Sequence, residues 1–311
     1  MAGILTEQVV SMPIGNPSTN GRSRTFTFMG KVDRVDIDNQ SITDWKCTGD
    51  PDKTINETAI GFQCELYAAA LRPRQLVTEL VLRLVKIPGI KFCGKDKGDP
   101  GAYEARCIEW IKNEVDGVRE HPLILSPARI SQARSWLWAK SQRIVVNRRT
   151  GDWDTNAKAC YTWKRACPCM PLCMCLAGGG NPQDIIDIDY ETCDPHPELD
   201  GAAGDIQNAS NVLTYSSAST HSLCEMKYYW RYQRCLRRRR DVGGDNLRVG
   251  SAVHVGLEAF ANSGIVAAIE AIVEWQKTNP VLGEDAWNKQ LQEAAKARAM
   301  VRVAAERWLI D

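Results

Sequence analysis

Two strand-like runs in the first fifty residues constrain this chain more than any other feature. Residues 25–36 and 41–46 alternate in side-chain character, and a turn-prone Asp-Asn-Gln segment lies between them. We therefore predict an antiparallel hairpin in which Asp33 and Asp44 converge at one end. Because strand side chains alternate with a period of two, Lys46 is expected on the same face as Asp44.

Two carboxylates and a lysine that meet at a strand end can hold a divalent cation. Carboxylates are hard oxygen ligands for Mg²⁺ or Mn²⁺ and leave coordination positions open for water and phosphate. The bound metal activates the water and polarises the phosphoryl group, and a lysine offsets developing negative charge. This chemistry hydrolyses phosphodiesters. The alternative interpretation is a solvated hairpin with ordinary surface charges.

These residues resemble the core of the PD-(D/E)XK nuclease superfamily, most closely the phage-type members of its RecB-like and CRISPR-associated exonuclease branch. That branch has Gly-x-φ-Asp, then Asp-Tyr/Trp-Lys-(Thr/Ser)-Gly, then a helix that opens with Gln and carries Tyr four residues later. Two details depart from the pattern, since no proline precedes the first aspartate and Cys47 interrupts the second motif. The matching residues are Gly30, Asp33, Asp44, Trp45, Lys46, Gln63 and Tyr67.

The resemblance implies an α/β fold with a restriction-endonuclease-like core, in which helices flank a mixed sheet. It also implies that Asp33 and Asp44 ligate Mg²⁺ or Mn²⁺, with the carbonyl of Trp45 as a third contact. Lys46 would act on the water or the phosphate. Gln63 and Tyr67 lie one helical turn apart within a single helix predicted over residues 57–71, and would order the lysine or the DNA backbone.

A second block of similarity lies near the other end of the chain. Cys224, an aromatic and basic stretch, and a Gly-x-x-φ-His-x-x-φ-Glu motif that contains His254 resemble the opening of the same nucleases. In that family the histidine belongs to the metal site, which places His254 with the two aspartates. A histidine on an apolar helix face could otherwise be packed in the core.

Twelve cysteines in 311 residues indicate metal ligation rather than a disulfide framework, because no secretory signal is evident. The iron–sulfur members of the family hold a [4Fe–4S] cluster with three late cysteines and one early cysteine. The resemblance assigns this role to Cys160, Cys167, Cys173 and Cys224. Zinc is the alternative metal. Cys169 and Cys175 could substitute within the group.

The order of these blocks is reversed relative to the family, so the chain looks circularly permuted. Residues 1–182 match the C-terminal half of the nuclease core, and residues 208–311 match its N-terminal half. Between them, residues 183–205 contain eight acids and no Lys or Arg, a composition typical of an exposed linker. We expect the two halves to form one nuclease domain, joined by a linker over 183–207. The alternative is a chain that joins parts of two genes and does not fold as one unit.

The expected partner is DNA, as single strands or ends, and proteins of phage or bacterial recombination and repair could accompany it. Net charge is only +1, but six arginines interleaved with aromatic residues favour a grip on phosphates and bases. We expect a cytoplasmic enzyme without a membrane span; the oligomeric state is not predicted. Two other classes stay open, a non-catalytic DNA-binding recombination protein and a zinc-stabilised structural protein. The arginines are Arg231, Arg234, Arg237, Arg238, Arg239 and Arg240.

Overall fold

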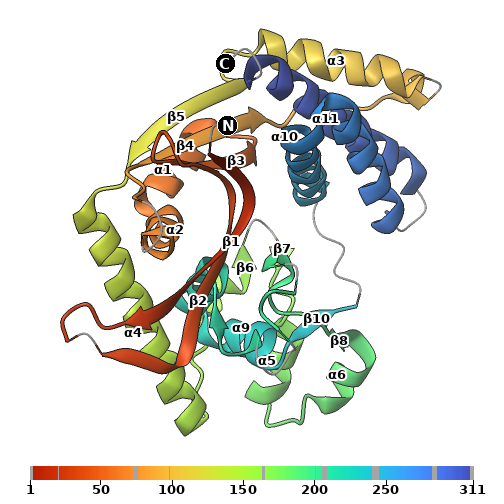
Figure 1. Cartoon of the computed structure of the whole chain (residues 1–311). Coiled ribbons are helices and arrows are strands. Elements are labelled where there is room, and N and C mark those ends of the chain that lie inside the picture. The colour runs from red at the N-terminus through yellow and green to blue at the C-terminus, as the bar shows by residue number, and fades with distance from the viewer. Residues whose placement is uncertain are drawn as a thin grey trace.

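A mixed β-sheet with helices on both faces forms the centre of the protein (Figure 1). The computed structural model describes residues 3–19, 21–72, 76–97, 99–162, 165–199, 201–204, 209–239, 245–281 and 286–308. The main path of the sheet has the order β1-β2-β3-β4-β5, and β9 joins β2 at its side. Its strands are β1 (Ile4–Gly15), β2 (Arg22–Asp36), β3 (Ser41–Thr48), β4 (Glu79–Lys86), β5 (Val118–Ile124) and β9 (Val212–Leu213).

The pairing directions are those of a mixed sheet, because β3 and β4 run parallel while the β1–β2, β2–β3 and β4–β5 pairs are antiparallel. The predicted hairpin is confirmed, with Arg34 opposite Thr43 and Asp36 opposite Ser41. Strand β5 was not predicted from the sequence. Pro122 lies within it, which an edge strand such as β5 tolerates because one side of its backbone needs no partner.

Helices cover the sheet from two sides (Figure 1). One core joins β1 and β2 to α2 and α4, and the other joins Trp45 and Val85 to α3, α10 and α11. The flanking helices are α1 (Pro51–Ile60), α2 (Gln63–Leu71), α3 (Pro100–Asn113), α4 (Pro127–Thr150), α8 (Tyr215–Leu223), α9 (Glu225–Tyr228), α10 (Asp245–Thr278) and α11 (Ala286–Trp308).

The single helix expected over residues 57–71 is two helices in the structure. Asp50 caps α1 by accepting a hydrogen bond from the main chain of Lys53, and α1 ends where Gly61 adopts an extended conformation. Helix α2 then begins at Gln63. The break does not change the spacing of Gln63 and Tyr67, which both belong to α2.

Helix α10 is interrupted at Gly264, whose φ of 82° lies in the left-handed region that favours glycine. By length and composition alone, residues 248–278 could cross a membrane. This is weak evidence, because the segment packs against α11 and the sheet and its Val253 and Ile272 are fully buried in the core of the protein.

Residues 167–190 and 226–236 form a smaller unit beside the sheet with its own core, which includes Leu172, Ile186, Tyr190 and Trp230. Within the described part of residues 183–207 the expectation of an exposed linker was wrong. A helix and a strand form there because Ile186 and Tyr190 supply apolar surface that this core buries. The elements in and around this unit are η2 (Ala157–Ala159), β6 (Tyr161–Thr162), β7 (Arg165–Ala166), α5 (Met170–Ala177), α6 (Gln183–Asp189), β8 (Tyr190–Thr192), η3 (Pro197–Leu199), the π-helix η4 (Tyr229–Gln233) and β10 (Leu236–Arg238), with η1 (Gly94–Lys97) elsewhere.

Candidate active site

The two aspartates of the hairpin lie together where β2 and β3 separate. The carboxylate of Asp33 accepts a hydrogen bond of 2.7 Å from the main-chain N–H of Trp45, which ties β2 to β3. On β3, the Nζ atom of Lys46 lies 3.0 Å from Oδ1 and 2.8 Å from Oδ2 of Asp44. The strand period therefore places the three charged groups in one cluster, as the sequence predicts.

Burial and neighbouring charges shift the pKa values of Asp33 and Lys46. Burial raises the pKa of Asp33 to about 7, and the nearby charge of Asp44 adds to the effect. For Lys46, burial opposes the charged form, but the attraction of Asp44 and Asp33 outweighs it and raises the pKa of the lysine. Asp33 is therefore only partly ionised near neutral pH, while Lys46 stays charged.

His254 reaches the same place from α10, more than two hundred residues along the chain. Its imidazole makes a hydrogen bond to the main chain of Trp45, and Asp44 and Lys46 both act on its charge. Burial lowers the pKa of His254, and the positive charge of Lys46 lowers it further. The imidazole is therefore neutral at physiological pH, the form that can accept a proton or ligate a metal.

Gln63 and Tyr67 stand on α2 above the hairpin. The Nε2 atom of Gln63 donates a hydrogen bond of 3.0 Å to the hydroxyl of Tyr67. The tyrosine ring packs directly against the backbone of Gly30, where an added Cβ would lie only 2.4 Å from the ring. Burial raises the pKa of Tyr67, so its hydroxyl stays protonated and can donate a hydrogen bond.

One cleft of about 730 Å³ contains all six side chains predicted to act in catalysis. It is lined by residues of β1, β2, β3, α2, α8 and α10, so it draws on both halves of the chain. The six are Asp33, Asp44, Lys46, Gln63, Tyr67 and His254.

A comparison with protein-family models matches residues 5–174 to the PD-(D/E)XK nuclease superfamily, which is more than half of the chain. The chain belongs to the PD-(D/E)XK nuclease superfamily. No curated protein and no solved structure matches it. The matched range contains the hairpin with Asp33, Asp44 and Lys46 and the helix with Gln63 and Tyr67; His254 and Cys224 lie outside it.

Nucleases of this superfamily use Mg²⁺ or Mn²⁺, and the carboxylate pair fits such an ion. Burial is the main cause of the raised pKa of Asp33, and the repulsion of Asp44 adds to it; a cation between the two carboxylates would relieve this repulsion. Among the described residues no three His, Cys, Asp or Glu side chains form a ready metal cage. The side chains would supply two carboxylates, and main-chain oxygen and water would complete the shell, as is usual for Mg²⁺.

Three acidic or basic side chains of the nuclease cleft were not expected from the sequence. Glu7 stands opposite Asp33 in the β1–β2 register and pairs with Lys31 at 2.6 Å. Its φ of 51° is unusual for a residue other than glycine. Glu198 enters the cleft from η3. Burial acts to raise the pKa of Glu198, but hydrogen bonds with His196 and Thr214 help to lower it. Glu7 and Glu198 lie outside the motifs in sequence, which explains why the motifs did not predict them.

The four cysteines assigned to a cluster face one small enclosed cavity, together with Cys169. Cys175 does not line it. The interactions of their thiols connect Cys160, Cys167, Cys173 and Cys224 in one electrostatic group, and all are free thiols. A hydrogen bond from Cys169 is the main cause of a pKa of about 6 for Cys167, which favours the thiolate that a metal needs.

The arginine stretch has a different environment from the one predicted. Arg237 pairs with Glu191 at 2.6 Å, and Arg238 lies 3.6 Å from Asp189, so the acidic segment neutralises part of the positive charge. Arg231 donates to the sulfur of Cys193, and Arg234 lies over the ring of Trp230. Arg239 is exposed, and Arg240 lies outside the described residues.

The expectation of aromatic stacking on DNA bases next to these arginines was wrong. Tyr228 is fully buried, and Trp230 and Tyr232 are buried as well. Tyr228 stacks with Trp153 and Tyr232 inside the protein, so these rings stabilise the fold and are not available to a ligand.

Proposed function

We propose that this protein is a metal-dependent deoxyribonuclease that hydrolyses phosphodiester bonds at DNA ends or in single strands. The observation that carries the proposal is the convergence of Asp33, Asp44, Lys46 and His254 in one cleft, although His254 lies far from the others in sequence. Membership in the superfamily supports a metal-dependent nuclease. The preference for DNA and for ends is our inference.

Asp33 and Asp44 would hold Mg²⁺ or Mn²⁺, with the carbonyl of Trp45 as a further ligand. When bound, the ion would polarise the phosphoryl group and lower the pKa of a bound water. The lysine beside Asp44 supplies a fixed positive charge where negative charge develops on the phosphate. His254 holds the main chain of Trp45 and can accept a proton, since its imidazole is neutral.

Gln63 and Tyr67 are positioning residues in this proposal. The hydroxyl of Tyr67 already receives a hydrogen bond from Gln63, which leaves its own proton free to be donated into the cleft. Both side chains come from the first turns of a short helix whose remaining side chains are buried. The helix therefore fixes their distance from the hairpin, which a reaction in defined geometry requires.

The test is a cleavage assay on end-labelled single-stranded and double-stranded DNA in Mg²⁺, Mn²⁺ or EDTA. The parent should cut in the metal arms alone, and Lys46→Ala and Asp44→Asn should abolish cleavage. Glu57→Gln, an exposed carboxylate of α1, is the matched control and should cut at the parental rate. Parental cleavage by Lys46→Ala would contradict the assignment, and a protein that binds but never cuts DNA would be an accessory factor.

We further propose that Cys160, Cys167, Cys173 and Cys224 hold a [4Fe–4S] cluster. The support is that these four thiols line one cavity and that Cys167 has a lowered pKa. Four thiolates meet the usual requirement of such a cluster. Cys224 follows α8, whereas Cys160 and Cys167 precede α5 and Cys173 lies within it, so the metal would join two distant segments of the chain. Zinc bound to the same thiols is the alternative that metal analysis distinguishes.

We also infer that the reversed order of the motifs reflects a circular permutation. Several contacts support it: β9 pairs with β2, α10 brings His254 to the cleft, and α11 packs on α3. Trp308, the last described residue, lies 5.2 Å from the guanidinium of Arg83 on β4. Helix α11 therefore ends beside the sheet to which β1 also belongs, as a permuted connection requires.

A further inference from the structure

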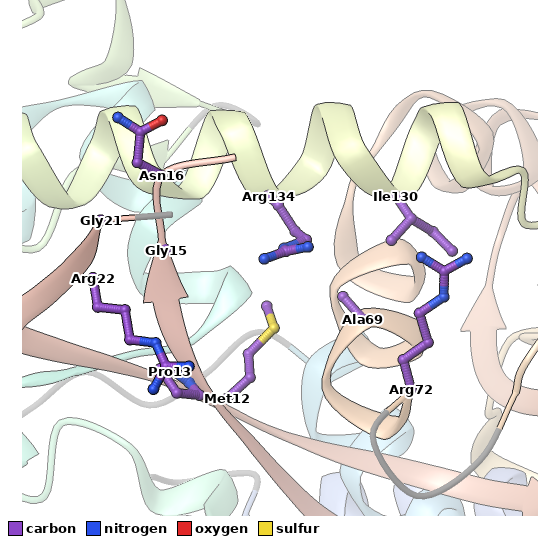
Figure 2. A pocket seen from close by; sticks show the side chains of 10 residues that line it. All are labelled: Met12, Pro13, Gly15, Asn16, Gly21, Arg22, Ala69, Arg72, Ile130 and Arg134. Carbon is purple, nitrogen blue, oxygen red and sulfur yellow. The ribbon is translucent and has the colours of Figure 1, made fainter. Parts of the chain in front are cut away.

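A second pocket lies away from the nuclease cleft, where the far end of the β1–β2 hairpin meets α2 and α4. Its volume is about 350 Å³. Figure 2 shows buried Met12, Ala69 and Ile130 around its centre, one from each of these three elements. We call it the arginine pocket because Arg22, Arg72 and Arg134 also line it.

The three arginines come from β2, the end of α2 and α4, and their side chains are exposed. Figure 2 shows Arg134 descending from α4 toward Met12, and Arg72 rising beside Ile130. Among the described residues their guanidinium groups have no ion pair or hydrogen bond, and no acidic residue lines the pocket. Three cations that line one pocket without a partner make it a candidate site for an anion.

The surroundings strengthen this reading. Residues 8–32 and all of α4 contain no Asp or Glu, while α4 alone carries six Arg and Lys residues. Other arginines of α4 are occupied, since Arg129 pairs with Glu65 and Arg143 with Glu225. Arg134 is therefore distinguished from these two neighbours by its freedom to bind an external group.

The arginine pocket and the nuclease cleft share two elements. On α2, Tyr67 faces the cleft while Ala69 faces the pocket, and on β1, Glu7 lines the cleft while Met12 lines the pocket. Five residues along a strand span about 16 Å at roughly 3.3 Å each. This distance corresponds to a few nucleotide steps of one DNA strand, because successive phosphates are about 3.4 Å apart along a duplex axis and farther apart along the strand itself.

We propose that the arginine pocket binds an internal backbone phosphate of the DNA strand whose scissile bond lies in the nuclease cleft, a few nucleotides away. Arg72 and Arg134 contact the phosphate oxygens, and the apolar floor accommodates the sugar. Guanidinium groups suit this role because they can donate two hydrogen bonds to one phosphate. The inference rests on the proposed function and adds the place where the substrate is held.

The experiment compares the double variant Arg72→Gln/Arg134→Gln with the double variant Lys91→Gln/Arg149→Gln. Both remove two exposed positive charges that make no ion pair with another described residue, and Arg149 belongs to the same helix as Arg134. Binding of a labelled oligonucleotide that spans both sites is measured in Ca²⁺ over a series of salt concentrations. The pocket variant should bind roughly tenfold or more weakly, and its salt slope should fall by about 2.

A substrate series locates the contact. A neutral methylphosphonate moved along the strand should weaken binding to the parent most at one internal position a few steps from the cleavage point, and should have no such maximum with the pocket variant. Weakening that depends only on a terminal phosphate, or competition by inorganic phosphate alone, would overturn the internal contact. Equal binding by the two double variants would overturn the pocket and leave the nuclease proposal standing. A parent that neither binds nor cuts DNA would overturn both.

Discussion

Gly30→Ala tests whether the Gly-x-φ-Asp motif needs glycine because of the tyrosine on α2. The added Cβ would lie 2.4 Å from Cε1 and 3.1 Å from Cδ1 of Tyr67. Carbon atoms pack favourably at about 3.5–4.0 Å, so the ring would have to move by roughly 1 Å. Tyr67 is buried and hydrogen-bonded to Gln63, so its ring cannot simply move out into solvent.

The expected loss of stability follows from these contacts. Overpacking a core costs about 1–3 kcal/mol, and replacing glycine by alanine within a strand returns about 0.5–1 kcal/mol. We therefore expect a net loss of roughly 1–2 kcal/mol, seen as a lower midpoint of urea unfolding. Cleavage should fall as well, because Gln63 and Tyr67 move relative to Asp33.

A double-mutant cycle makes the reasoning testable. In a Tyr67→Ala background the ring is absent, so Gly30→Ala should be neutral or slightly stabilising, with an interaction free energy of roughly 2 kcal/mol. Gly49→Ala is the matched control, because an added Cβ there meets no described atom within 4 Å. If Gly30→Ala lowers the midpoint equally in both backgrounds, contact with Tyr67 is not the reason for the glycine.

Three further outcomes are expected. In EDTA, the stability that protonated Asp33 contributes is complete below about pH 4 and is lost as the pH rises through its pKa of about 7. Asp33→Asn should therefore raise the midpoint of urea unfolding at pH 8 and change it little at pH 4. Parallel pH curves for the parent and the variant would contradict this. Cys224→Ser should remove iron and sulfide from anaerobically purified protein while Cys175→Ser retains them, and colourless parent protein containing zinc would contradict the cluster. A chain rejoined from residue 311 to residue 1 and opened between Gly180 and Asn181 should fold and cleave, since that loop is exposed; an insoluble or inactive product would argue against the permutation.

Much of the active site could be predicted because its geometry is local. Asp33, Asp44 and Lys46 belong to two strands joined by a four-residue turn, so the period of the strands and a short connection suffice to bring them together. Gln63 and Tyr67 are one helical turn apart on α2, and the helix period alone places both side chains on one face. The split of the predicted helix at Gly61 did not disturb this.

The environment of the arginines could not be predicted from their pattern. An aromatic and basic stretch is compatible with a nucleic-acid surface or with a core that has charged edges, and composition is the same in both cases. The outcome depends on whether Glu191 and Asp189 reach Arg237 and Arg238 from more than forty residues away. The arginine pocket was missed for the same reason, since Arg22, Arg72 and Arg134 are scattered in the sequence.

The sequence by itself determined the hairpin with its carboxylates and lysine, the facing pair on α2 and the family, because spacing within one element or one short turn fixes the relative positions of side chains. Only the tertiary structure decided that Glu7 stands opposite Asp33 and that arginines without a partner line one pocket. The position of His254 in the cleft follows from the family resemblance and not from local spacing. Contacts between distant segments depend on how sheet pairing and core packing close the long connections, and spacing along the chain does not encode that closure.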